Sequence, residues 1–129
     1  MESWETAGVA AALSARDTAY APYSQFKVGA ALYTDSDKWY TGANIENAAF
    51  GATICAERVA ACAAWSDGNR KWLGMTIAAP GEIVPCGICL QFLVELAPDL
   101  LLILVNAETQ NVRALSLKEL LPHPFDGRS

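Results

Sequence analysis

Basic residues are scarce in this sequence of 129 residues: 9 lysines and arginines stand against 14 aspartates and glutamates, a formal net charge of −5. Proteins that grip a nucleic acid usually show a basic face, because neutralising phosphates supplies much of their affinity. Here the basic residues are scattered along the chain. The composition therefore argues against a long nucleic acid as partner and is compatible with a neutral small molecule.

Long apolar runs and a basic N-terminal segment are also missing. The longest apolar stretches, residues 83–94 and 100–107, fall short of the roughly 18–20 residues that cross a bilayer. The first five residues include two glutamates and no basic residue, unlike the start of a secretory signal. We therefore expect a cytoplasmic protein with no membrane partner. In that reducing compartment, four cysteines indicate metal binding or catalysis rather than disulfides.

The sequence contains no internal repeat, linker or low-complexity tract, so we expect residues 1–129 to form one catalytic domain. Its length suffices to bury a core without disulfides. Hydrophobic residues make up 53 % of the chain. This apolar surplus in a short chain suggests that some of it is buried against another subunit.

Hydrophobic periodicity and turn residues predict an α/β fold. Between the predicted helices and strands, the turn at 35–37 indicates a hairpin, Thr53 is a candidate N-cap, and Ser116 with Glu119 forms a capping-box pattern. The order suggests a three-layer α/β/α arrangement with a mixed sheet of about five strands. The predicted helices cover residues 3–20, 53–65, 85–96 and 116–121, and the strands 27–34, 38–43, 72–79, 100–106 and 111–114.

Three cysteines near predicted helix starts are the most informative residues. Cys86 and Cys89 form a Cys-x-x-Cys pair, which aims two sulfurs at one point from a single turn, and Cys55 precedes another helix. Helix dipoles and backbone N–H groups favour the thiolates. Three protein sulfurs leave one tetrahedral position open, as in a catalytic zinc site.

Glu57 follows Cys55 by two residues, close to such a metal without having to ligate it. A carboxylate there could take a proton from water that zinc has acidified to a pKa of about 7 and deliver it later. Zinc deaminases combine a His or Cys first ligand with a non-ligating Glu in this way. From spacing alone, a structural zinc site and a redox pair stay open as alternatives.

The fourth cysteine, Cys62, is expected to lie outside the site. It follows Cys55 by seven residues, which places it about 10 Å further along a helix at 1.5 Å per residue. Cys55 and Cys62 are therefore too far apart to bind the same ion, and we expect Cys62 to pack in the core.

Five segments resemble, in order, motifs of the small zinc-dependent homotetrameric cytidine deaminases. The resemblance covers nearly the whole chain and implies that family's fold, one Zn²⁺ per chain, and hydrolytic deamination of cytidine and 2′-deoxycytidine to uridine and 2′-deoxyuridine in pyrimidine salvage. The segments are YAPYSQFKVGAAL at 20–32, TGANIENA at 41–48, CAER at 55–58, PCGIC at 85–89 and LLP at 120–122 with Phe125.

The resemblance also assigns roles to individual residues. It implies zinc ligation by the three cysteines, proton transfer by Glu57 and hydrogen bonds from Arg58 to ligand sulfurs. Without the resemblance, the sequence would predict that Arg58 is an exposed residue of a helix and that Phe26 is an aromatic residue of the hydrophobic core. The implied zinc ligands are Cys55, Cys86 and Cys89, and the implied substrate contacts are Phe26 on the pyrimidine ring, Asn44 and Glu46 on the ribose hydroxyls, Ala56, and Phe125 from a neighbouring subunit.

Two positions depart from the family pattern. Leu90 stands where an arginine commonly follows the last cysteine, and we expect it to be a packing residue at a subunit contact. His123 and Pro124 replace a glycine-containing segment before Phe125. Neither change touches a ligand or the glutamate.

Three other functions are weighed against cytidine deamination. A deaminase of another aminopyrimidine nucleoside, such as blasticidin S, would share the zinc ligands, but Asn44 and Glu46 favour a plain ribose or deoxyribose. A polynucleotide-editing enzyme is disfavoured by the acidic balance. In a non-catalytic zinc module, Glu57 would have no purpose.

Overall fold

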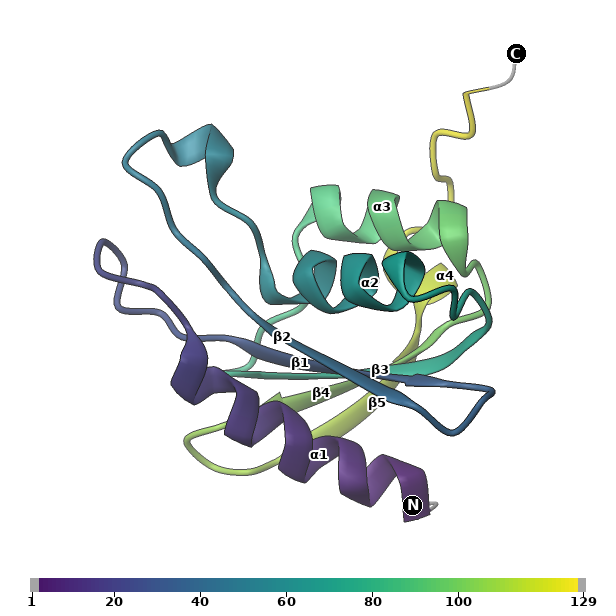
Figure 1. Cartoon of the computed structure of the whole chain (residues 1–129), viewed down its shortest axis with the longest axis horizontal. Helices are drawn as coiled ribbons and strands as arrows, with labels where there is room; N and C mark the ends of the chain where they lie inside the picture. The colour runs from purple at the N-terminus through teal and green to yellow at the C-terminus, as the bar shows by residue number, and fades with distance from the viewer. Residues whose placement is uncertain (1–2, 128–129) are drawn as a thin grey trace.

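A five-stranded sheet in the order β2-β1-β3-β4-β5 forms the middle layer of the protein (Figure 1). The computed structural model describes residues 3–127. The helices are α1 (Ser3–Ala15), α2 (Ala56–Ser66), α3 (Gly87–Leu96) and α4 (Leu117–Leu120), with 3₁₀ turns at Arg16–Thr18 and Phe50–Ala52. The strands are β1 (Gly29–Thr34), β2 (Trp39–Ala43), β3 (Trp72–Ala79), β4 (Leu101–Asn106) and β5 (Val112–Ser116).

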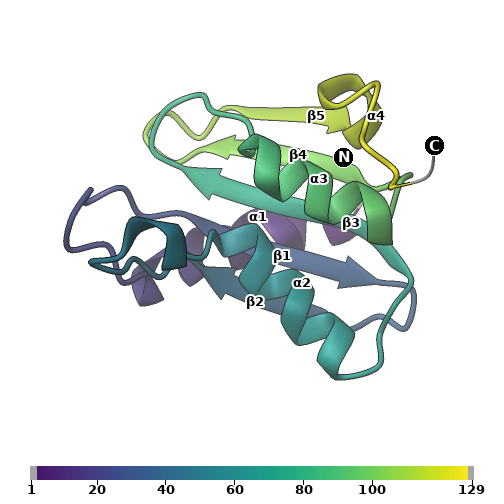
Figure 2. The same cartoon turned by 90° about the horizontal axis from the view of Figure 1, so that it is seen from above.

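The sheet is mixed, as the sequence predicts. β1 pairs antiparallel with β2 and with β3, β3 pairs parallel with β4, and β4 pairs antiparallel with β5. The parallel pair needs a crossover, and α3 supplies it. α1 covers one face, while α2 over β1 and β2 and α3 over β3 and β4 lie side by side on the other (Figure 2). The expected three-layer α/β/α fold is confirmed.

Small residues let α2 approach the sheet closely. Ala56, Ala60 and Ala64 are fully buried along one face of α2. Opposite them on β2, Gly42 has no Cβ, and one built there would lie 2.6 Å from the backbone nitrogen of Ala60 and 2.7 Å from the carbonyl oxygen of Ala56. The position of the first turn of α2 therefore depends on a glycine in β2.

Two expected helix boundaries are wrong. The first helix ends at Ala15 and a 3₁₀ turn follows, rather than continuing to residue 20. α2 begins at Ala56 with Cys55 as N-cap, not at Thr53. The reason is that Ile54 and Ile45 exchange two backbone hydrogen bonds, which hold this segment extended. The Thr53 hydroxyl accepts instead from the backbone N–H of Asn47 at 3.2 Å.

Other local expectations are confirmed. The hairpin turn at 35–37 joins β1 and β2, and Ser116 and Glu119 form a reciprocal capping box at α4. Leu90 is 6 % exposed and belongs to the main hydrophobic core, so it is a packing residue. Its expected location at a subunit contact stays a prediction, and only a small part of its side chain remains uncovered by its own chain.

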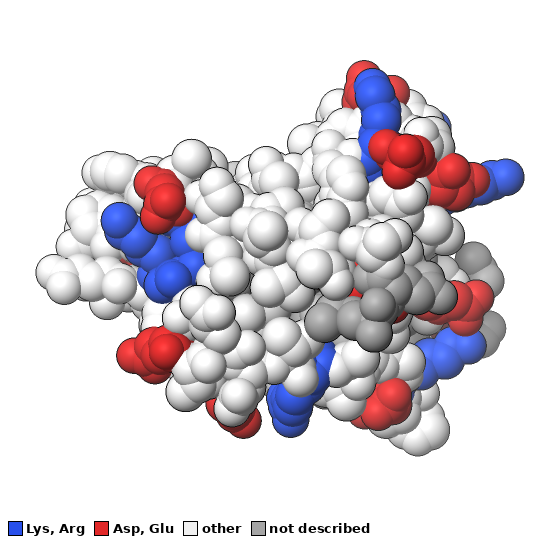
Figure 3. All heavy atoms as spheres, turned by 90° about the horizontal axis from the view of Figure 1, so that it is seen from below, with Lys and Arg blue, Asp and Glu red and all other residues white. Residues whose placement is uncertain are grey.

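Charges of both signs are mixed among the described residues on the face that α1 covers. Figure 3 shows this face, on which lysines and arginines lie among aspartates and glutamates around an uncharged centre. Within residues 3–127, no helix has the length and apolar character needed to span a membrane.

Gly42→Ala should destabilise the protein, because the added methyl group meets the backbone of α2 rather than a flexible side chain. Overpacking of this kind typically costs about 1–3 kcal/mol in free energy of unfolding, and urea denaturation would measure it. Gly51→Ala is the matched control, since no atom lies within 4 Å of its added Cβ. Equal stability losses in the two variants would contradict the close approach of α2.

Candidate metal and substrate site

Two helix N-termini converge on one cluster of sulfurs. Cys55 is the N-cap of α2, Cys86 is the N-cap of α3, and Cys89 lies in the first turn of α3. Their Sγ atoms all lie within 4.8 Å of one another, and those of Cys86 and Cys89 are 3.6 Å apart. A tetrahedral zinc with Zn–S bonds of about 2.3 Å would separate its sulfurs by about 3.8 Å. The cluster therefore fits a zinc ion.

Cys62 lies outside this cluster, as expected, but its expected burial is wrong. Its side chain is exposed on the outer side of α2, next to Trp65 and Phe92. The sulfur lies two turns beyond Cys55, on the side of α2 turned away from the buried Ala60 and Ala64.

Positive groups surround the sulfurs. The Nη2 atom of Arg58 lies 3.6 Å from the Sγ atom of Cys55 and can donate a hydrogen bond to it. The pKa of Cys55 is lowered to about 5, mainly because the Cys89 thiol donates a hydrogen bond to its sulfur, and also because Arg58 lies nearby. The pKa of Cys89 is raised, because its thiol donates that hydrogen bond and because it is buried. The Cys55 thiolate in turn raises the pKa of Arg58. The part-buried Arg58 is thus directed at a ligand sulfur, not at solvent.

Glu57 is buried beside the cluster. Its side chain is 5 % exposed, although it lies in the first turn of a helix. Burial raises its pKa, and the nearby Cys55 thiolate raises it further. A buried carboxyl group with a raised pKa beside a metal site is suited to accepting and releasing a proton.

A cleft of about 550 Å³ joins the sulfurs to the expected substrate residues. A pocket of this size is in the range of small-molecule sites. Its wall contains Phe26, Asn44, Glu46 and Ala56 from the expected substrate set, Cys55, Cys86 and Glu57 from the reactive end, and also Ser24, Val28, Thr53, Ile83, Val84 and Pro85.

Asn44 has a structural task that sequence reasoning missed. Its Oδ1 atom accepts the backbone N–H of Val28 at 2.9 Å, and its Nδ2 group donates to the carbonyl of Phe26 at 2.8 Å. The side chain thereby fastens the end of β2 to the segment before β1. One N–H of its amide stays available to a ligand.

Glu46, two residues later, is held by a turn that the sequence does not single out. Its Oε1 atom accepts the backbone N–H groups of Tyr23 at 2.9 Å and Ser24 at 3.1 Å, and its Oε2 atom accepts the Ser24 hydroxyl. The Ser24 hydroxyl is the main cause that lowers the pKa of Glu46. The carboxylate is therefore ionised at neutral pH and fixed in orientation.

Phe125 lies apart from the cleft of its own chain. The side chain of Gln91 binds both backbone groups of Phe125, accepting its N–H at 3.2 Å and donating to its carbonyl at 2.6 Å. The phenylalanine ring is 78 % exposed. The chain thus presents this ring at its surface through a contact that the sequence alone did not reveal.

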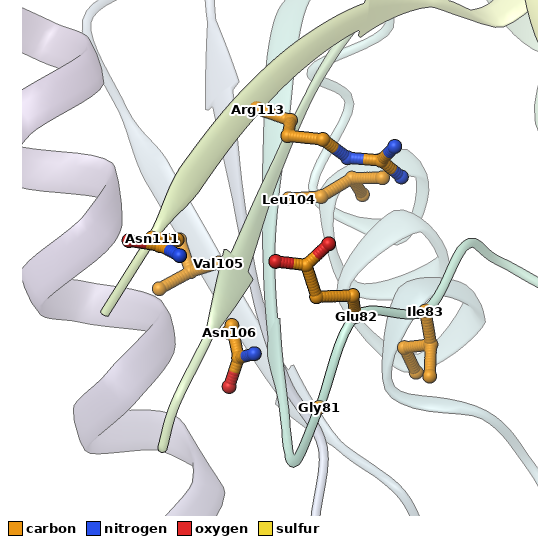
Figure 4. A pocket seen from close by; sticks show the side chains of 8 residues that line it. All are labelled: Gly81, Glu82, Ile83, Leu104, Val105, Asn106, Asn111 and Arg113. Carbon is orange, nitrogen blue, oxygen red and sulfur yellow. The ribbon is translucent and has the colours of Figure 1, made fainter. Parts of the chain in front are cut away.

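A second cavity near the end of β3 is too small for a nucleoside. Its volume is about 10 Å³, room for a single water molecule. Figure 4 shows Glu82 and Arg113 extending to the same side of β4 at this cavity. The cleft of about 550 Å³ is the candidate site because Cys55, Cys86 and Glu57 line it.

Comparison with known proteins connects this geometry to a family. The chain is similar to cytidine deaminase from Burkholderia pseudomallei, with 40 % identity, a TM-score of 0.88, and coverage of 97 % of this chain and 100 % of that one. It is also similar to cytidine deaminase from Mycobacterium tuberculosis, with 34 % identity, a TM-score of 0.81, and coverage of 97 % and 98 %.

A curated cytidine deaminase from Halalkalibacterium halodurans is 40 % identical over 116 residues, which are 88 % of each chain. The family model of the cytidine and deoxycytidylate deaminase zinc-binding region matches residues 2–105, a span that includes all three clustered cysteines and Glu57. The chain therefore belongs to the zinc-dependent cytidine deaminase family.

Proposed function

We propose that this protein hydrolytically deaminates cytidine and 2′-deoxycytidine to uridine and 2′-deoxyuridine, with one zinc ion per chain. One observation carries the proposal: a cleft of about 550 Å³ contains the cysteine cluster and the buried Glu57 together with the amide and carboxylate of Asn44 and Glu46. The relatives named above as cytidine deaminases support the same activity.

Each reactive residue has a distinct task in this proposal. Cys55, Cys86 and Cys89 hold zinc, which when bound supplies a Lewis acid that lowers the pKa of water. Glu57 takes one proton from the attacking water and delivers it to the pyrimidine ring nitrogen, and it then carries the second proton of that water to the amine, which leaves as ammonia. A buried carboxyl with a raised pKa suits this repeated proton transfer. Arg58 offsets the negative charge of the thiolates through Cys55.

The other wall of the cleft positions the nucleoside. Phe26 offers an aromatic surface to the pyrimidine ring, and Ala56 leaves room beside it. Asn44 has a spare N–H donor and Glu46 a spare acceptor, which suit a sugar hydroxyl. A neutral sugar fits this end better than a phosphate, since Glu46 carries a negative charge at neutral pH.

The other functions fit these residues less well. A non-catalytic zinc module has no use for a carboxyl group that is 5 % exposed beside the sulfurs, since burying it is costly. A deaminase of a different aminopyrimidine nucleoside is not favoured by relatives at 40 % identity that carry the name cytidine deaminase.

We propose a homotetramer in which Phe125 of one chain contacts the nucleoside in another. Its exposed ring and its attachment to Gln91 support this arrangement, because an exposed aromatic fixed by its backbone is ready to enter a neighbouring pocket. We further propose the reducing cytoplasm as its location, where four free cysteines persist as thiols.

Cytidine and 2′-deoxycytidine should release ammonia when mixed with the zinc-loaded protein, and a coupled ammonia assay would measure this directly. Cytosine should be a poor substrate because it lacks the sugar that Asn44 and Glu46 bind. Cytidine 5′-monophosphate should also be poor because its phosphate meets acidic side chains. Faster turnover of the monophosphate than of cytidine would contradict the assignment, and absence of ammonia from cytidine would refute the function.

Cys86→Ala should lose the zinc, because two sulfurs remain where three are needed, whereas Cys62→Ala should keep about one zinc per chain. Metal analysis of protein purified without chelators would measure both. The pair is matched, since both cysteines are exposed and only one belongs to the cluster. Full zinc content in Cys86→Ala would refute the ligand assignment.

Glu57→Gln should lower kcat by at least about 10²–10⁴-fold while zinc stays bound, because glutamine keeps the shape of the side chain but cannot carry the proton. Steady-state kinetics combined with metal analysis would separate the two effects. Near-normal turnover in the zinc-loaded variant would rule out Glu57 as the proton carrier.

A further inference from the structure

The carboxylate of Glu46 is gripped by a single short turn. The backbone N–H groups of Tyr23 and Ser24 both donate hydrogen bonds to Oε1, and the Ser24 hydroxyl donates to Oε2. A carboxylate offers about four acceptor positions. The turn therefore occupies three of them and leaves one, on Oε2, for a ligand.

The same hydroxyl has a second partner. Its oxygen accepts the backbone N–H of Phe26 at 3.0 Å, and the carbonyl of Phe26 accepts from Asn44. Ser24 thus links the three residues that line the nucleoside end of the cleft. The intervening residue, Gln25, has a φ of 57°, a left-handed conformation that is uncommon for residues other than glycine. Its N–H binds the carbonyl of Ala21 at 2.9 Å, which closes the turn.

We propose that Ser24 is a positioning residue that sets the affinity for the nucleoside sugar. Its hydroxyl fixes the Oε2 atom of Glu46 relative to Phe26, so that the sugar and the pyrimidine ring are bound in one arrangement. This inference rests on the proposed function and concerns binding, not proton transfer. Within residues 3–127, the hydrogen bonds of Ser24 reach neither a clustered cysteine nor Glu57.

Removal of this hydroxyl should leave the fold intact. In Ser24→Ala, the backbone N–H groups of Tyr23 and Ser24 still bind Oε1. Oε2 loses its partner and is free to rotate away from the position that a sugar hydroxyl needs. Because the lost bond has a charged acceptor, we expect KM for cytidine and Kd for uridine to rise about 10-fold, with kcat changed by less than about twofold.

A double-mutant cycle distinguishes positioning through Glu46 from a general structural role. We would measure cytidine kinetics, and uridine Kd by calorimetry, for the zinc-loaded wild type, Ser24→Ala, Glu46→Gln and the double variant. The expected result is that Ser24→Ala weakens binding in the wild type but adds less than about twofold in the Glu46→Gln background. Ser24→Thr keeps the hydroxyl and should restore wild-type affinity.

Ser36→Ala is the matched control. Its hydroxyl also donates to a side-chain oxygen, that of Asn69, but lies in the hairpin turn outside the cleft, so KM and Kd should not change. The proposal is overturned by equal losses from Ser24→Ala in both backgrounds, by a fall in kcat at constant KM, or by unchanged affinity. A wild type that binds uridine but releases no ammonia from cytidine would refute the proposed function. The uridine Kd values of the four proteins would then still test whether Ser24 positions Glu46. A wild type that does not bind uridine would overturn both.

Discussion

The close contact between α2 and the sheet is the constraint on which the site depends. Gly42 and the alanines of α2 allow helix and strand to approach to backbone distance, and this sets how close the first turn of α2 lies to the sheet. α3 lies beside α2 on the same face because it crosses over between two parallel strands. The two helix starts then meet at one point, and three sulfurs need no further loop to bring them together.

The electrostatics of the site follow from that meeting. Three thiolates around one divalent cation carry a net charge of −1, which weakens the metal as a Lewis acid. Two helix N-termini and Arg58 lie against the sulfurs and counter this charge. Leu90 is an uncharged residue of the apolar core, so it adds no positive charge at this site. Glu57 is a carboxylate buried next to the cluster, and its raised pKa follows from that burial.

The sequence predicts the reactive half of the site better than the binding half. The spacing of Cys55, Cys86 and Cys89 predicts a shared metal, because helix starts have a defined geometry that spacing reveals. The sequence could not place Ser24, since its contact with Glu46 joins two loops across 22 positions and depends on the unusual backbone of Gln25.

Most strands and helices are predictable from local patterns, and the errors have a common physical origin. The predicted start of α2 is wrong because a long-range bridge between Ile45 and Ile54 outweighs the capping tendency of Thr53. The burial of Cys62 is predicted wrongly because cysteine counts as an apolar residue, whereas alanines fill the side of α2 that faces the sheet. In each case a tertiary contact or a helix orientation overrides what neighbouring residues indicate.

The crossover between β3 and β4 also sets the order in which the chain can assemble. The hairpin of β1 and β2 needs only the short turn at 35–37, whereas parallel pairing must first close a loop that contains the whole of α3. All three sulfurs precede residues 101–106 along the chain, and the core that α3 joins through Leu90 and Leu93 includes Leu102 and Leu104 of this strand. The sulfurs are therefore synthesised before the strand whose side chains complete the core beneath α3, and we expect their final geometry to form only once β4 has joined the sheet.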